Sequence, residues 1–170
     1  MSLLHYPIFL DIEASGLVIE SYPIEIAWND ASGEITSFLI TPVSEWTYWS
    51  IEAEHLHRIK HEELNKNGIS IHEACDRLDA VLSGSHIYSD APYYERQWLD
   101  KLYDTAGRKR PFTVKGISDI KKIYRNFELN DGQSNYERFM EQAFKELGDQ
   151  HRATVDVKAL MRAYQLCHEA

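Results

Sequence analysis

The sequence predicts an α/β protein in which a mixed sheet is flanked by helices. Strand patterns dominate residues 6–40, and helical patterns interleaved with short apolar strands follow over the rest of the chain. Short turns separate the first three strand patterns, which is typical of an antiparallel meander. With 170 residues and no interdomain linker or repeat, residues 1–170 are expected to form one domain with a sizeable core.

The first three strands follow from short apolar or alternating runs. The run Tyr6–Leu10 predicts a central strand covered on both faces. The stretch Tyr22–Trp28 alternates and carries Pro23 at its start, where a strand tolerates proline. Turn residues at 29–33 then lead into a third strand over Ile35–Ile40.

Capping signals mark the helices that come next. Ser50 is a suitable N-cap for a helix over 51–56, and Asn67-Gly68 would end a second helix over 61–66. Ser70 and Glu73 have the spacing of a capping box at the start of a third helix. The predicted apolar face of that helix consists of Ala74, Leu78, Val81 and Leu82.

The remaining elements alternate between strand and helix. Strands are predicted at 86–89 and 112–114, and Pro92 suits the first turn of the helix between them. That helix has its apolar positions at Tyr94, Trp98, Leu99 and Leu102. Further helices are predicted over 118–125, over 136–147 and from about His151 onward, with a loop at 131–134.

Composition restricts the partners of the chain. It carries 27 acidic and 18 basic residues, a net charge of −9, which argues against an enzyme that tracks along long duplex DNA. No apolar run approaches the ~20 residues of a membrane helix, and the first residues lack the pattern of a signal peptide. Cys75 and Cys167 match no metal or redox spacing. These features favour a cytoplasmic protein with reduced cysteines.

Asp11 and Glu13 follow the first apolar run and stand two residues apart. In an extended strand their side chains point to the same face. Partly buried neighbouring carboxylates are costly unless a positive charge compensates them, and a divalent cation with oxygen ligands can do so. The alternative for this pattern alone is a pair of solvated carboxylates at a strand end.

A second motif, from His151 through Ala153 to Asp156, favours the metal site over the pair of solvated carboxylates. It resembles the third motif, H-x-A-x-x-D, of the DEDDh 3′→5′ exonucleases of the DnaQ and ribonuclease T-like superfamily. The stretch around Asp11 resembles the first motif of the same family, with Ser15 where threonine is more common. The resemblance covers about residues 6–166 and implies a ribonuclease H-like mixed sheet, with an antiparallel three-strand meander plus parallel strands.

The resemblance implies hydrolysis of phosphodiester bonds with two divalent ions, Mg²⁺ or Mn²⁺, roughly 4 Å apart. Asp11, Glu13 and Asp156 would be metal ligands, and His151 would be the general base that takes a proton from water. His151 and Asp156 are five residues apart, about 500° on a helix, so they do not share a helix face. His151 is therefore expected in a loop before the helix that carries Asp156.

The fourth carboxylate is open between two residues. The second motif of the family corresponds to the stretch that begins at Ser89, where Asp90 stands in the place of an asparagine, Tyr94 in that of the aromatic residue and Glu95 in that of an aspartate. Glu95 is the preferred metal ligand and catalytic residue, although Asp90 could turn toward the site instead. Asp90 and Tyr94 are otherwise expected to contact substrate.

The substrate implied by the family is the 3′ end of a single-stranded nucleic acid, released as nucleoside 5′-monophosphates. Ser15, Gly16 and Leu17 match the positions that hold the terminal nucleotide, although Gly16 and Leu17 could equally be a turn glycine and a core leucine. The acidic charge favours RNA or short oligonucleotides. Many relatives in the family are homodimers, so a homodimer is a further expectation.

Two other features carry alternatives. The cluster Trp46–Trp49 could stack on bases, but core anchoring under a loop is the preferred interpretation. The basic stretch 107–111 is expected to be a solvated loop, with phosphate contacts as the alternative. A non-catalytic domain that binds a nucleic-acid end or a protein, and a structural subunit of a larger assembly, are the competing functions.

Overall fold

The computed structural model describes residues 5–120, 135–148 and 151–169. Their core is a five-stranded sheet in the order β3-β2-β1-β4-β5. The strands are β1 (Ile8–Ala14), β2 (Pro23–Asn29), β3 (Ile35–Leu39), β4 (His86–Ser89) and β5 (Thr113–Gly116). β1, β2 and β3 pair antiparallel, whereas β4 pairs parallel with β1, and β5 parallel with β4. The predicted mixed sheet, with its meander and its parallel strands, is confirmed.

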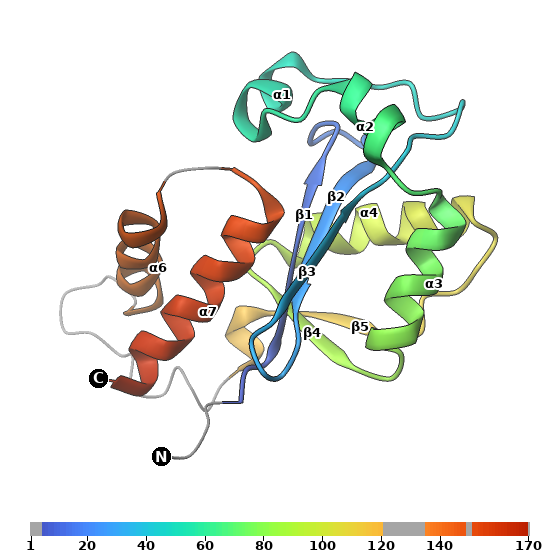
Figure 1. The fold of residues 1–170 in the computed structure, drawn as a ribbon. Coiled ribbons are helices and arrows are strands. Elements are labelled where there is room, and N and C mark those ends of the chain that lie inside the picture. The colour runs from blue at the N-terminus through green and yellow to red at the C-terminus, as the bar shows by residue number, and fades with distance from the viewer. Residues whose placement is uncertain (1–4, 121–134, 149–150, 170) are drawn as a thin grey trace.

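Helices cover both faces of the sheet. The described helices are α1 (Ile51–His57), α2 (His61–Asn67), α3 (Ile71–Leu82), α4 (Pro92–Thr105), α6 (Asn135–Leu147) and α7 (Ala153–Glu169), with a short 3₁₀ helix at Ile117–Asp119. Figure 1 shows α3 and α4 on one side of the sheet, α6 and α7 on the other, and α1 and α2 at one end. Every residue of β2 is buried, as expected for a strand covered on both faces.

Two hydrophobic clusters hold these layers together. The larger lies between the sheet and α3 and α4, and includes Leu10, Ile24, Leu78, Leu82 and Leu99. The smaller lies between the sheet and α7 and α6, and includes Phe9, Ala27, Met140, Val157 and Leu160. β1 supplies residues to both clusters because its side chains alternate between the two faces. This central strand also carries Asp11 and Glu13.

The segment at the end of the sheet is shaped by its caps. The Ser50 hydroxyl accepts a hydrogen bond from the Ala53 amide at 3.2 Å and starts α1, as predicted. Gly68 ends α2, as predicted, but for a different reason than a left-handed backbone, since its φ is −74°. A Cβ at Gly68 would lie 2.4 Å from the Leu64 carbonyl oxygen and 2.6 Å from the Thr41 amide, so only glycine fits against these neighbours.

Several expectations need correction. β1 continues to Ala14, so Asp11 and Glu13 lie within a strand and not beyond its end. Val81 is 53% exposed and does not belong to the buried face of α3. The basic stretch is not simply solvated, because Arg108 forms ion pairs with Asp76 and Asp79, each at 2.6 Å. Arg110 likewise pairs with Asp100 at 3.0 Å.

Other predictions are confirmed or fall outside the described residues. Trp46 is buried and stacks on Tyr22, with ring centroids 5.1 Å apart, so it is a core anchor and no exposed interface residue. Cys75 and Cys167 are both free thiols. The helix predicted over 118–125 lies largely outside the described residues, as does the loop at 131–134. Among the described residues, no helix has the length and apolar character needed to cross a membrane.

Candidate active site

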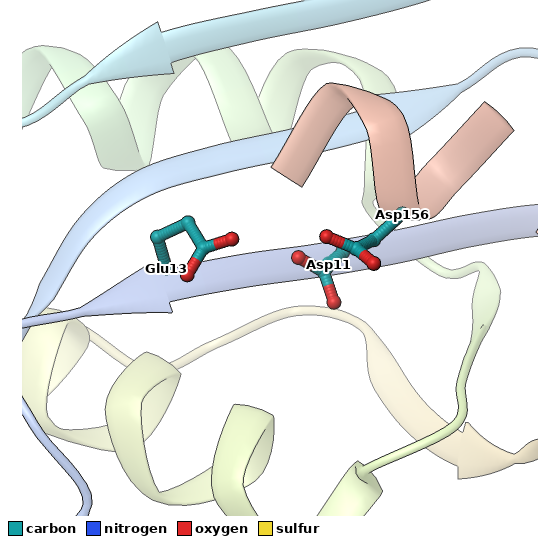
Figure 2. Close-up of side chains that lie close together, drawn as sticks. All are labelled: Asp11, Glu13 and Asp156. Atoms are coloured by element: carbon teal, nitrogen blue, oxygen red, sulfur yellow. The ribbon is translucent and has the colours of Figure 1, made fainter. Parts of the chain in front are cut away.

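Carboxylates from distant parts of the chain meet beside β1. Asp11 and Glu13 are two residues apart on β1 and project to the same side, toward Asp156 in the first turn of α7 (Figure 2). One carboxylate oxygen from each of these three residues lies within 4.8 Å of the others. The first and third motifs of the resemblance therefore form one cluster.

A second cluster shares Asp11 with the first. Oxygens of Asp11, Asp90 and Glu95 also lie within 4.8 Å of one another. β4 runs parallel to β1, so the turn after β4 brings Asp90, and the first turn of α4 brings Glu95, to the region of Asp11. The structure thus brings together both candidates for the fourth carboxylate, with Asp11 between the two clusters.

The two candidates differ in their surroundings. Glu95 is 1% exposed, and its carboxylate accepts a hydrogen bond from the Ser89 hydroxyl. That hydroxyl in turn accepts from the Ala91 amide at 3.0 Å, which fixes it at the end of β4. Asp90 is exposed at the rim. Glu95 is therefore a buried carboxylate oriented by Ser89, whereas Asp90 is exposed to solvent.

The electrostatics of the site disfavour ionised carboxylates in the absence of a cation. Burial, followed by repulsion from Asp156 and Glu95, raises the pKa of Asp11 well above its ordinary value. Burial together with the charge of Asp156 raises the pKa of Glu13 to about 8, although Arg152 acts in the opposite direction. Burial raises the pKa of Glu95 to about 8, against the hydrogen bond from Ser89. The cost arises from desolvation and from like charges in close proximity.

These donors fit divalent cations. All the groups in both clusters are carboxylate oxygens, which are the ligands that Mg²⁺ and Mn²⁺ prefer. The elevated pKa values come from burial and mutual repulsion, so the charge of a bound cation would offset them by stabilising the ionised carboxylates. The shared position of Asp11 allows two such ions, one in each cluster.

A hollow of about 300 Å³ lies beside Glu13, between the loop after β1 and helix α1. Its walls are largely apolar and include Leu17, Val18, Tyr48, Leu56 and Trp98. Gly16 forms part of the wall, and a Cβ at this position would lie 2.6 Å from Cε1 of Tyr48. A flat, partly apolar group the size of a nucleotide base could enter this space.

The residues that the sequence predicts to bind substrate differ in their exposure and in whether they line the hollow. Leu17 is 67% exposed at the mouth of the hollow, which contradicts the core-leucine alternative. Ser15 is fully buried, and its hydroxyl accepts from the Tyr22 amide at 3.1 Å, so it closes the loop and does not line the hollow. Tyr94 is half-buried and stacks on Trp98, with ring centroids 5.6 Å apart.

His151 is where its spacing from Asp156 predicts. It precedes the first residue of α7, Ala153, and its exposed side chain lines the hollow together with Glu13. The imidazole and the cluster of Asp11, Glu13 and Asp156 are thus brought to the same end of the sheet, with His151 on a segment outside the helix.

Three residues at the site were not anticipated. His57 is buried at the end of α1, lines the hollow, and accepts a hydrogen bond from the Ile59 amide through Nδ1 at 3.0 Å. Burial lowers its pKa to about 4, which keeps the ring neutral. Ser89 and Glu25 are the other two. A single charged residue in the otherwise apolar Tyr22–Trp28 stretch was the available signal for Glu25.

Comparison with known proteins gives one kind of match. No family model matches the chain, and no curated protein matches it. Among solved structures, the chain resembles E. coli Exonuclease I in complex with a dA16 oligonucleotide, with a TM-score of 0.70 and 15% identity over 95% of this chain and 41% of that one. Its product-bound structure matches with a TM-score of 0.66 and 16% identity, over 95% and 42% of the two chains.

This chain therefore spans about two fifths of the length of the Exonuclease I chains that it matches. At a sequence identity of 15–16%, the match shows a shared fold but does not show a shared substrate. The homodimer that the family resemblance implies stays a prediction. Taken together, the strand order, the flanking helices and the structural match show that this chain has a ribonuclease H-like fold, which it shares with the matched part of Exonuclease I.

Proposed function

We propose that residues 1–170 act as one metal-dependent 3′→5′ exonuclease domain, which hydrolyses phosphodiester bonds at the 3′ end of a single-stranded nucleic acid and releases nucleoside 5′-monophosphates. The observation that carries the proposal is that Asp11 belongs to two carboxylate clusters at once. Three other buried or half-buried acids, Glu13, Asp156 and Glu95, surround Asp11, and such a group of carboxylates is costly without a bound cation.

In this proposal Asp11, Glu13 and Asp156 hold one divalent ion, and Asp11 and Glu95 hold the other. Mg²⁺ or Mn²⁺, when bound, supplies charge neutralisation at the phosphate and a more acidic water. Glu95 is preferred to Asp90 because it is buried and oriented by Ser89. Asp90 lies close enough to contribute through its own carboxylate or to contact substrate.

His151 acts as the general base. An imidazole nitrogen of its side chain takes the proton from the attacking water, as imidazole groups do near neutral pH. Its place on the segment before α7 lets the ring approach the carboxylate cluster from the solvent side. The leaving 3′ oxygen of the upstream nucleotide takes up a proton from solvent when the bond breaks.

The terminal nucleotide occupies the hollow beside Glu13. Main-chain groups near Gly16 face its sugar, and the exposed side chain of Leu17 packs against its base. The expectation of RNA rests on net charge alone, and Exonuclease I was crystallised with dA16 and dT13 oligonucleotides. The proposal therefore names single-stranded nucleic acid of either sugar.

The test is degradation of 5′-labelled single-stranded RNA and DNA of matched sequence, with Mg²⁺, with Mn²⁺ and with EDTA. Wild type should give a metal-dependent ladder that shortens from the 3′ end. Asp11→Asn should give none, because Asp11 serves both clusters. Asp104→Asn, an exposed carboxylate on α4, is the matched control and should behave as wild type.

The competing function is a non-catalytic domain that binds a nucleic-acid end. Glu95 in place of the family's aspartate is the feature that favours it. Binding of the labelled strands with no shortening under either metal would support this alternative, and would end the exonuclease proposal.

A further inference from the structure

Glu25 is a buried carboxylate on β2 that is not part of either acidic cluster. It is 3% exposed, and its side-chain hydrogen bonds with the described residues run to the segment that enters α7. The Arg152 guanidinium donates to Oε2 through Nε at 3.0 Å and to Oε1 at 2.6 Å. The Ala153 amide donates to the same Oε2 at 3.0 Å. The two-point contact fixes the position and orientation of the Arg152 side chain, and the backbone contact fixes the Ala153 amide.

These contacts hold the short segment that connects two proposed site residues, His151 and Asp156. Arg152 is adjacent to His151, and Ala153 is the first residue of α7. The Arg152 carbonyl accepts hydrogen bonds from Val155 at 2.8 Å and from Asp156 at 3.1 Å, so it also starts the helical turn that carries Asp156. One side chain therefore restrains the residue after His151 and the turn that bears Asp156.

Stability alone is a poor explanation for this placement. Glu25 is the register partner of Glu13 on the neighbouring strand, so it adds a carboxylate beside groups that already repel one another. Buried ion pairs often contribute little net stability, because desolvation offsets their attraction. A neutral capping residue would satisfy the Ala153 amide without this cost. The charged pair does more, because it sets the geometry of Arg152.

We propose that Glu25 is a positioning residue, which holds His151 and Asp156 in their working relation to Glu13 through Arg152 and the first amide of α7. The inference rests on the proposed exonuclease activity for its kinetic consequence. Its structural part, the restraint on the start of α7, holds independently of any activity.

The kinetic test compares Glu25→Ala, Glu25→Gln and Arg152→Lys in the degradation assay. Glu25→Ala should lower kcat by about 10²-fold, the effect of a small misplacement of a reacting group, and should change KM by less than about threefold. Glu25→Gln keeps an oxygen for the Ala153 amide and should recover part of kcat. Arg152→Lys keeps the charge but loses the two-point contact, so it should resemble Glu25→Gln.

Arg162→Ala is the matched control, because it breaks an ion pair of α7 with Glu146 that is 2.7 Å long and lies outside the site. It should lower the melting temperature and leave kcat unchanged. A second readout is amide hydrogen exchange at Ala153 in the metal-free protein. This exchange should be faster by at least about tenfold in Glu25→Ala than in wild type or in Arg162→Ala.

The outcomes separate the two proposals. Faster exchange at Ala153 with an unchanged kcat in Glu25→Ala overturns the positioning role. So does a kcat loss that Arg162→Ala reproduces, since that loss would follow general stability. Unchanged exchange at Ala153 overturns the restraint itself. An inactive wild type refutes the exonuclease proposal, and the exchange experiment then still decides whether Glu25 holds the start of α7.

Discussion

At the scale of single residues, the site depends on how carboxylates with different surroundings share one small region. Asp11 contributes to two clusters, Glu13 and Asp156 to one, and Glu95 to the other. Burial beside like charges raises the pKa of Asp11, of Glu13 and of Glu95. Exchanging one carboxylate for its amide removes charge with little change in shape, so such variants separate charge from packing.

The fourth carboxylate can be identified by comparing Glu95→Gln with Asp90→Asn. Glu95→Gln should lower kcat by at least about 10²-fold, a usual loss when one preorganised electrostatic group is removed. Asp90→Asn should cost less than about tenfold, because this side chain is exposed to solvent. Steady-state kinetics on a short single strand measures both. The reverse order would make Asp90 the fourth carboxylate.

His151 is expected to contribute to rate rather than to binding. His151→Ala should lower kcat by about 10²–10⁴-fold, the usual range for a general base. His72→Ala, an exposed histidine on α3, serves as the control and should leave kcat unchanged. A loss of less than tenfold in His151→Ala would remove this residue from the role of base.

At the scale of elements, the site forms because β1 has an antiparallel neighbour on one side and a parallel neighbour on the other. The antiparallel neighbour β2 places Glu25 opposite Glu13, and the parallel neighbour β4 delivers the turn to α4. The loop between β1 and β2 is closed by Ser15, whose amide donates to the Tyr22 carbonyl at 2.9 Å. The Ser15 carbonyl accepts from the Ser50 amide at 2.8 Å, which ties this loop to the start of α1. A backbone hydrogen bond therefore joins the two walls of the hollow.

Gly16→Ala tests this hollow. The new Cβ would lie 2.6 Å from Cε1 of Tyr48 and 3.2 Å from Cβ of Ser50, so the Tyr48 ring must move and the hollow changes shape. We expect KM to rise on the order of tenfold, equivalent to ~1.4 kcal/mol of binding, with a smaller change in kcat. Oligonucleotide titration of the initial rate measures both. An unchanged KM would show that the nucleotide does not occupy this hollow.

At the scale of the whole molecule, the acidic site couples folding to pH and metal. The pKa of Glu13 and of Glu95 is raised from 4.5 to about 8 in the folded chain. Between these values the folded state binds more protons than the unfolded state, so the free energy of unfolding falls as pH rises. His57 has the opposite effect only at lower pH, because its pKa is lowered from 6.5 to about 4.

The metal-free protein should therefore melt at a lower temperature at about pH 8.5 than at about pH 6.5. Saturating Mn²⁺ should raise the melting temperature and reduce this pH dependence, since bound metal stabilises the ionised carboxylates. A hundredfold excess over Kd corresponds to ~2.7 kcal/mol, or roughly 5–10 °C for a chain of this size. Differential scanning calorimetry with EDTA and with Mn²⁺ measures both shifts. A melting temperature that rises with pH in EDTA would contradict the assigned pKa directions.

Much of the architecture was predictable because its signals are local. Alternating and apolar runs, Ser50 as an N-cap and Gly68 as a helix end depend on neighbours within a few residues, and the structure confirms each. That Asp11 and Glu13 share one face follows from strand geometry, whereas the position of His151 before the helix that carries Asp156 follows from helix geometry together with the family resemblance. Sequence therefore determined the strands and most helices, and with the family resemblance it gave the candidate carboxylates of the acidic site.

Only the tertiary structure decided how those residues meet. The sharing of Asp11 between two clusters depends on strand order, and the contacts of Glu25 join residues 127 and 128 positions apart. Arg108 and Arg110 looked like solvated cations, because nothing local shows that Asp76, Asp79 and Asp100 fold against them. Periodicity and capping act over one or two turns of chain, whereas desolvation and charge pairing depend on which distant segments the core brings into contact.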